Sequence, residues 1–205
     1  MNPSFPAFDA HSVGAVVVGG SAGSSGPLRA ILRTLTPEFP APVVIVLHLH
    51  PSDRGVMADN LRRQVPLPVH EVLDKMPARP GRIYVAPADY HLLAERNGTF
   101  SLSLDAPVRD SRPSIDVFLH SAVSAWGPRL LAILLSGANE DGAAGLQAVL
   151  RGGGVALAQD PETADFPRMP AAAIARSGLR RGLRPEELAD LLHRIEEEVR
   201  RGRRQ

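Results

Sequence analysis

Short apolar runs alternate with amphipathic stretches along most of the chain. Val43–Leu47 and Leu130–Leu135 are apolar at every position, which is typical of strands covered on both faces of a parallel sheet. Residues 28–35 instead carry leucine and isoleucine at the i, i+3, i+4 and i+7 spacing of a helix face. Strands alternating with helices predict an α/β fold, a three-layer doubly wound sheet that is mainly parallel and has right-handed crossovers.

The same pattern gives the order of the elements. Predicted strands cover residues 13–19, 43–47, 69–73, 82–86, 130–135 and 155–158. Predicted helices cover residues 28–35, 54–64, 113–126, 171–176 and 185–200, and a further helix follows Gly142 and ends at Leu150. Residues 159–170 are predicted as a loop. Two segments flank Asn97-Gly98, a strong hairpin signal, and we expect this antiparallel hairpin at one edge of the sheet.

The length of 205 residues suits one domain. We expect a loose lead-in over residues 1–12, one domain over residues 13–199 and a basic tail over residues 200–205. Residues 1–11 do not show the basic and then apolar order of a signal segment. Apolar runs also stay well below the ~18 residues of a membrane span. These features predict a cytoplasmic protein without membrane insertion.

Composition narrows the possible functions. The formal net charge is +1, which argues against bulk electrostatic binding to nucleic acid. The sequence contains no cysteine, so disulfides, thiol catalysis and cysteine-ligated metals are excluded.

Ser21 stands out in the turn after the first predicted strand. It is flanked as Gly19-x-Ser21-x-Gly23, and the glycines leave room around the side chain. A serine between a strand and a helix can act as a nucleophile, with its anionic intermediate held by backbone N–H groups. Such a turn can also cradle a phosphate, although the dinucleotide and Walker patterns are both absent. A turn of small residues without chemistry is the third reading.

Sites in doubly wound sheets gather beyond the carboxyl ends of the strands. That rule selects Ser21, His48 and Asp141, the hydroxyl, imidazole and carboxylate that serine hydrolases use. Their order along the chain differs from the Ser, Asp, His order of α/β-hydrolases. His48 is alternatively a structural histidine, and Asp141 a helix N-cap. Spacing alone does not separate His48 from His50, and we interpret the remaining histidines as surface or structural: His11, His70, His91, His120 and His193.

Six blocks in register resemble the chemotaxis protein-glutamate methylesterases (CheB). The segment 17–23 resembles the family's nucleophile motif, G-A-S-x-G-G, at Ser21. The segment 46–51 resembles its histidine motif and selects His48 over His50, and the segment 134–145 resembles its aspartate motif at Asp141. Three further blocks match, at residues 83–92, 112–116 and 158–174, and together the blocks extend from about residue 13 to 192.

The resemblance implies a serine hydrolase that removes methyl groups from glutamate γ-methyl esters and can also deamidate glutamines. It implies Ser21, His48 and Asp141 as the catalytic triad, and backbone N–H groups of Ala22 and Ala138 as the oxyanion hole. It implies no cofactor and no metal. The implied partners are methylated cytoplasmic helices of chemoreceptors, and a methyltransferase or a separate response regulator of the same pathway.

The chain departs from the family pattern at several positions. Gly20 stands for the usual alanine, Ser24 for a glycine, and Ala138 and Asn139 for methionine and glycine. Full-length family members also carry an N-terminal receiver domain. We therefore expect either a stand-alone catalytic domain of this type over residues 13–199 or a piece of a longer protein. A receptor-binding adaptor with little turnover, or a phosphate- or nucleotide-binding domain, remains as an alternative hypothesis.

Overall fold

The core of the fold is a six-stranded parallel sheet. The computed structural model describes residues 9–203, and its strand order is β3-β4-β2-β1-β7-β8. The strands are β1 (Ala15–Gly20), β2 (Val43–Leu47), β3 (Val69–Glu71), β4 (Ile83–Val85), β7 (Leu130–Leu134) and β8 (Val155–Ala158). From β1, the chain forms β2, β3 and β4 on one side of β1, and it then crosses to β7 and β8 on the other side. The topological switch point, where ligands bind in such sheets, therefore lies between β1 and β7.

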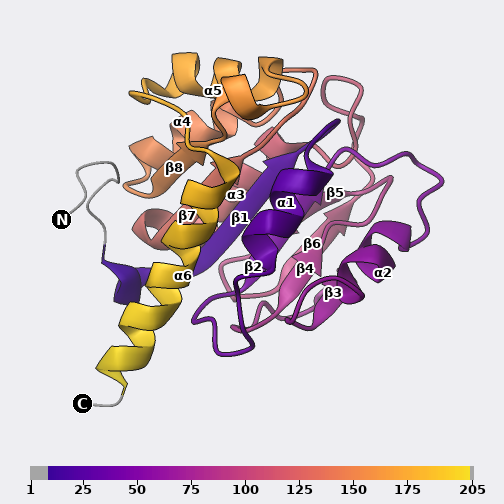
Figure 1. The fold of residues 1–205 in the computed structure, drawn as a ribbon. Coiled ribbons are helices and arrows are strands. Elements are labelled where there is room, and N and C mark those ends of the chain that lie inside the picture. Colours follow the sequence, from indigo (N-terminus) through magenta and orange to yellow (C-terminus); the bar gives the residue numbers. More distant parts are fainter. Residues whose placement is uncertain (1–8, 204–205) are drawn as a thin grey trace.

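Helices cover both faces of this sheet (Figure 1). One face carries α1 (Ser25–Leu32), α2 (Val56–Arg62) and α6 (Pro185–Gly202). The other face carries α3 (Ile115–Trp126), α4 (Ala143–Arg151) and α5 (Arg168–Ser177). Short 3-10 turns lie at Ala10–Ser12, Gly127–Arg129 and Pro161–Thr163.

The central strands are buried along their whole length. Their side chains alternate between two hydrophobic cores because successive residues of a strand point to opposite faces. Val16 and Val18 pack toward α1 and α6, and Val17 packs toward α3. This two-sided burial explains why the strands read as unbroken apolar runs. The predicted three-layer, mainly parallel class is confirmed.

The predicted antiparallel hairpin is present, but it forms a sheet of its own and does not pair with the main sheet. This two-stranded sheet consists of β5 (His91–Ala94) and β6 (Phe100–Ser103). The edge strands of the main sheet are β3 and β8. The hairpin buries its apolar side against α3, where the rings of Phe100 and Phe118 lie 6.5 Å apart. In addition, the Ala94 N–H donates to the Ser121 hydroxyl (3.0 Å). Packing on a helix thus replaces pairing with the sheet edge.

Several helix limits also differ from the prediction, and α1, for example, covers Ser25–Leu32 and not residues 28–35. Helix α5 begins at Arg168, inside the predicted loop, and its first turn contains Pro170, which a helix tolerates because the first N–H groups need no intrahelical partner. Helix α6 continues through Gly202 into the expected tail. Residues 1–8 of the expected lead-in and 204–205 of the expected tail lie outside the described residues.

Candidate active site

Ser21 and His48 follow neighbouring parallel strands. Gly20 of β1 is in register with Leu47 of β2, so the next residue of each strand emerges at the same edge, about 4.8 Å apart along the sheet. The His48 N–H donates to the Gly20 carbonyl (3.2 Å), and the Ser21 N–H donates to the Ser136 carbonyl beyond β7 (2.9 Å). These ladder bonds fix Ser21 at the switch point between three strand ends.

The imidazole of His48 is paired with the carboxylate of Asp141. Its Nε2 lies 2.8 Å from Asp141 Oδ2, and the two side chains are 12% and 0% exposed. His50 is exposed and contacts the hydroxyl of Ser52 instead. The geometry therefore separates two histidines that spacing alone left equivalent.

Asp141 receives its remaining bonds from the N-terminus of α3. Its Oδ2 accepts the Ile115 N–H (2.6 Å), and its Oδ1 accepts the Asp116 N–H (3.0 Å) and the Ser114 hydroxyl (2.9 Å). The N-cap of its own helix α4 is Gly142, with no side-chain cap bond. Asp141 is therefore not the α4 cap of the alternative reading, and its carboxylate joins α3 to His48.

These bonds decide the charge of Asp141. Burial raises the pKa of this carboxyl, but the hydrogen bonds from His48 and from the Asp116 and Ile115 amides outweigh burial and hold the pKa below its ordinary value. Asp141 is therefore a carboxylate at neutral pH. A buried carboxylate bonded to an imidazole fixes the tautomer of the ring and stabilises its protonated form.

Two glycines allow α3 to approach this closely. A Cβ on Gly19 would lie 2.7 Å from the Ile115 side chain, and one on Gly142, whose φ is +92°, would lie 2.9 Å from it. Behind α3, His91 is 2% exposed, and its Nδ1 accepts the Ser114 N–H (3.2 Å). His91 is thus structural, as the sequence reading expected.

The turn after β1 is tied to the loop after β7. The Ser136 hydroxyl donates to the Ala22 carbonyl (2.8 Å) and accepts the Phe166 N–H (3.0 Å). The Ser136 N–H donates to the side-chain carbonyl of Gln159, which is fully buried (3.0 Å). Ser114, Ser136 and Gln159 all belong to blocks that the sequence singled out without giving these residues a role. Their roles depend on contacts across the sheet that spacing does not encode.

The backbone N–H groups of Ala22 and Ala138 are the predicted oxyanion-hole donors. Both residues are exposed, and within residues 9–203 neither N–H donates to any acceptor. Next to Ala138, the side-chain oxygen of Asn139 accepts the Asp141 N–H (3.1 Å). The residue that departs from the family pattern here therefore stabilises the loop that carries Asp141. Two free donors beside a serine could hold an oxyanion.

Charged and aromatic side chains border the site. Glu140, half exposed, is paired with Arg168 at the start of α5 (3.1 Å) and with Arg109 (3.8 Å). Phe166 is 43% exposed, and its ring would lie 3.1 Å from a Cβ on Gly23. No group of three or more His, Asp or Glu side chains in the described range 9–203 could hold a metal ion.

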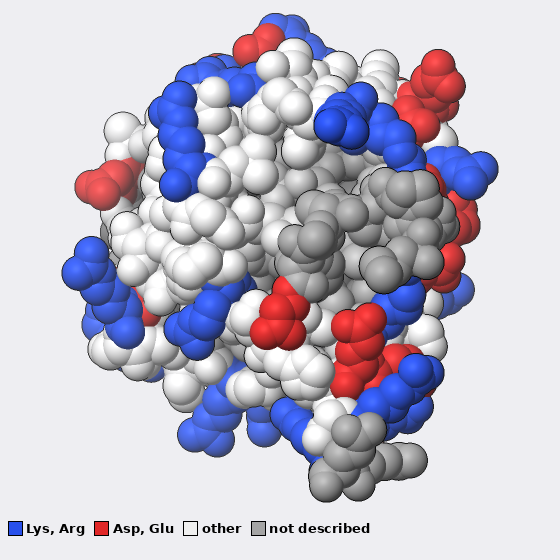
Figure 2. Space-filling model, turned by 90° about the vertical axis from the view of Figure 1, so that its left-hand side faces the viewer, with Lys and Arg blue, Asp and Glu red and all other residues white. Residues whose placement is uncertain are grey.

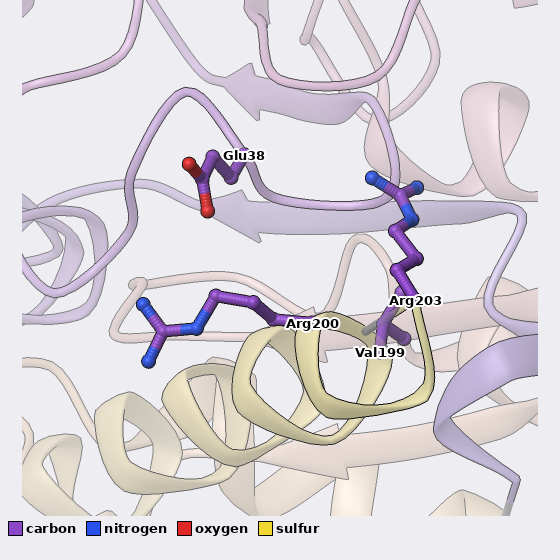
Figure 3. Close-up of a pocket in the computed structure, with 4 residues that line it drawn as sticks. All are labelled: Glu38, Val199, Arg200 and Arg203. Atoms are coloured by element: carbon purple, nitrogen blue, oxygen red, sulfur yellow. The ribbon is translucent and has the colours of Figure 1, made fainter. Parts of the chain in front are cut away.

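Other surface features lie away from the strand ends. A cavity of about 320 Å³ is lined by Glu38, Val199, Arg200 and Arg203 (Figure 3). It lies between α6 and the loop that leads into the amino end of β2, opposite to the edge that holds Ser21. On the face shown in Figure 2, basic and acidic side chains are interspersed among uncharged residues. None of the helices formed by residues 9–203 has the length and apolarity needed to cross a membrane.

Fold and site together define a doubly wound α/β protein with serine, histidine and aspartate at three strand ends. The family model for CheB methylesterase matches residues 16–192. A putative protein-glutamate methylesterase/protein-glutamine glutaminase of Leptospira interrogans is 38% identical over 183 residues, 89% of this chain and 95% of that protein. The catalytic domain of Thermotoga maritima CheB methylesterase has a TM-score of 0.84 at 31% identity, covering 89% of this chain and 98% of that one. The chain belongs to the CheB methylesterase family, whose named enzymes are carboxylic ester hydrolases.

Other relatives are longer. A protein-glutamate methylesterase/protein-glutamine glutaminase of Nocardioides sp. is 38% identical over 180 residues, which are 86% of this chain and 48% of that protein. The chain thus spans about half the length of this relative.

Proposed function

We propose that this protein is a protein-glutamate methylesterase that acts on γ-methyl esters of glutamate in the cytoplasmic helices of chemoreceptors. The observation that carries the proposal is the pairing of His48 with a buried, ionised Asp141 at the strand end beside Ser21. The names of its relatives support the substrate class. The substrate places the enzyme in the cytoplasm, where a methyltransferase of the same pathway would form the ester.

The proposed reaction begins with proton transfer from Ser21 to His48. His48 donates its Nε2–H to Asp141, which leaves the lone pair of Nδ1 to accept the Ser21 hydroxyl proton. The serine oxygen bonds to the ester carbonyl carbon, and the carbonyl electron pair moves onto oxygen. The resulting oxyanion accepts hydrogen bonds from the N–H groups of Ala22 and Ala138. One such donor lowers the barrier by about 3 kcal/mol.

The intermediate then collapses with loss of methanol. The C–O bond to the methoxy group breaks, and protonated His48 gives its proton to the departing oxygen. Water, deprotonated by His48, attacks the glutamyl ester of Ser21 and releases glutamate and the free serine. Attack on a glutamine side chain would follow the same steps with loss of ammonia, which extends the proposal to deamidation. We assign these steps to the domain of residues 13–199.

A fluorophosphonate probe tests the reaction class, because it labels only an activated serine. We expect labelling of the wild type at Ser21, and a loss of at least 100-fold in labelling rate for Ser21→Ala and for His48→Ala. Ser25→Ala and His50→Ala are matched controls, because both residues are exposed and lie near the site, and they should label like the wild type. A folded wild-type protein that stays unlabelled would contradict the hydrolase and favour a binding module on this fold.

A further inference from the structure

Two peptide groups carry the N–H donors of the proposed oxyanion hole, and both are held through their carbonyl oxygens. The Ala22 N–H shares a peptide plane with the Ser21 carbonyl, which accepts the Ser24 N–H (3.1 Å) and the Ser24 hydroxyl (2.6 Å). The Ala138 N–H shares a plane with the Gly137 carbonyl, which accepts the Met169 N–H (2.9 Å). In a trans peptide the N–H and C=O point in opposite directions. Fixing the carbonyl therefore also fixes the N–H of the same peptide, which points away from that carbonyl.

The Ser24 hydroxyl serves this purpose in an unusual way. Ser24 is the N-cap of α1 and is 1% exposed, but its side chain makes no cap bond to the helix. An N-cap serine ordinarily accepts an N–H from the first turn. Here the hydroxyl instead donates backward, to the carbonyl of the candidate nucleophile. The side chain is thus committed to the turn and not to the helix.

Gly20 makes room for this hydroxyl. A Cβ on Gly20 would lie 2.7 Å from Ser24 Cβ and 2.9 Å from Ser24 Oγ, closer than real Cβ atoms come to other heavy atoms. An alanine at position 20 would therefore need the space that the side chain of Ser24 occupies.

We propose that Ser24 is a positioning residue for the oxyanion hole, and that Gly20 and Ser24 are a coupled pair in which only one position can carry a side chain. The hydroxyl of Ser24 fixes the Ser21–Ala22 peptide so that the Ala22 N–H meets the charge developing on the substrate oxygen. This inference rests on the proposed function. The inference adds Ser24 to the proposed function as a residue outside the triad that helps to stabilise the transition state.

The first test uses Ser24→Ala, which removes the hydroxyl but retains Cβ. Loss of a whole oxyanion donor costs on the order of 10²–10³ in kcat. Loss of its orientation should cost less, and we expect a fall of about 10-fold. KM for p-nitrophenyl acetate should stay unchanged, and the free energy of unfolding should fall by no more than about 1 kcal/mol, the contribution of one neutral hydrogen bond. The Ki of a trifluoromethyl ketone, which binds as a tetrahedral oxyanion, should rise in parallel with the fall in kcat.

The second test is a double-mutant cycle on the same assays. Gly20→Ala alone should lower both kcat and the unfolding midpoint, because its methyl group collides with Ser24. Combining it with Ser24→Gly should remove the collision, so the double variant should be more active and more stable than Gly20→Ala alone. Additive losses would show that the two positions are independent and would overturn the coupling.

The outcomes distinguish this inference from the proposed function. An active wild type with unchanged kcat and Ki in Ser24→Ala would overturn the positioning role alone. A fall in kcat accompanied by lower stability and an unchanged Ki would assign Ser24 a merely structural role. A folded wild type that neither hydrolyses p-nitrophenyl acetate nor reacts with a fluorophosphonate would overturn the proposed function and this inference with it.

Discussion

Replacing Asp141 with asparagine should separate the two tasks of this carboxylate. Its two oxygens accept four hydrogen bonds, from His48, Ser114 and two backbone N–H groups of α3. Asp141→Asn keeps the shape but replaces one acceptor oxygen by an NH₂ group. Each oxygen serves one backbone N–H, so the amide must leave one of these donors without an acceptor in either orientation.

The structure sets the expected magnitude. A buried donor left without an acceptor costs about 1–3 kcal/mol, and a hydrogen bond to a charged group contributes about 1.5–3 kcal/mol. The hydroxyl of Ser114 and the ring of His48 can adapt, whereas the backbone N–H groups of Ile115 and Asp116 cannot. We therefore expect Asp141→Asn to lower the free energy of unfolding by about 2–4 kcal/mol. Its kcat should fall on the order of 10³-fold, because the His48 imidazolium loses its counter-charge or takes the wrong tautomer.

The matched control is Asp116→Asn, the same change at the neighbouring buried carboxyl. Burial raises the pKa of Asp116, and its Oδ1 accepts one bond, from the Gly145 N–H (2.7 Å). Asparagine retains that acceptor and removes a poorly solvated charge. Its free energy of unfolding at pH 7 should therefore equal or exceed that of the wild type, and kcat should change less than about threefold.

Urea unfolding and ester hydrolysis at several pH values provide the assay. The folded-state pKa of Asp141 is depressed, so its stabilising contribution is present above the unfolded pKa of 3.8 and disappears as the pH falls through the folded pKa. The stability gap between wild type and Asp141→Asn should therefore narrow in acid. If Asp141→Asn unfolds within about 1 kcal/mol of the wild type at pH 7 and retains kcat within tenfold, the roles assigned to these four hydrogen bonds are wrong.

Three further outcomes can be measured by similar means. Gly23→Ala should lower the free energy of unfolding by about 1–3 kcal/mol, because φ is +76° and the new Cβ would lie 2.6 Å from the Ser136 hydroxyl; an unchanged urea midpoint would contradict this. Ser136→Ala loses the bond to the Ala22 carbonyl (2.8 Å) and should lower kcat about 10-fold with KM unchanged, as measured with p-nitrophenyl acetate. The hydrogen bond from Arg181 lowers the pKa of Glu187 to about 2. Glu187→Gln should therefore lower the free energy of unfolding by under about 1 kcal/mol at pH 7, and by nothing at a pH below the folded-state pKa of Glu187. A loss of stability that persists in acid would contradict the ion pair.

The sequence predicted those features that depend on local pattern. The limits of β2 and β8 agree with the apolar runs, because strands buried on both faces leave no polar residue inside them. The sequence selected Ser21, His48 and Asp141 as candidates because parallel strands bring their carboxyl ends together, and the structure places β1, β2 and β7 side by side. The start of α5 was missed, since Pro170 reads as a helix breaker but lies in a first turn.

Features that depend on contacts across the fold were beyond the sequence. Nothing in the spacing indicates that Asp141 is held by α3 and not by its own helix α4. The hairpin signal at Asn97-Gly98 is local, whereas its packing on α3 depends on the tertiary position of Phe118. The two departures at Gly20 and Ser24 read as mild substitutions until the structure brings them into contact.

Methanol release from a methylated chemoreceptor tests the central claim most directly. Wild-type protein and Ser21→Ala are incubated with receptor carrying labelled methyl esters, and volatile methanol is counted over time. We expect release by the wild type and a fall of at least 100-fold for Ser21→Ala with unchanged folding. Equal release by both proteins would contradict Ser21 as the nucleophile, and no release by a folded, probe-reactive wild type would contradict the receptor ester as its substrate.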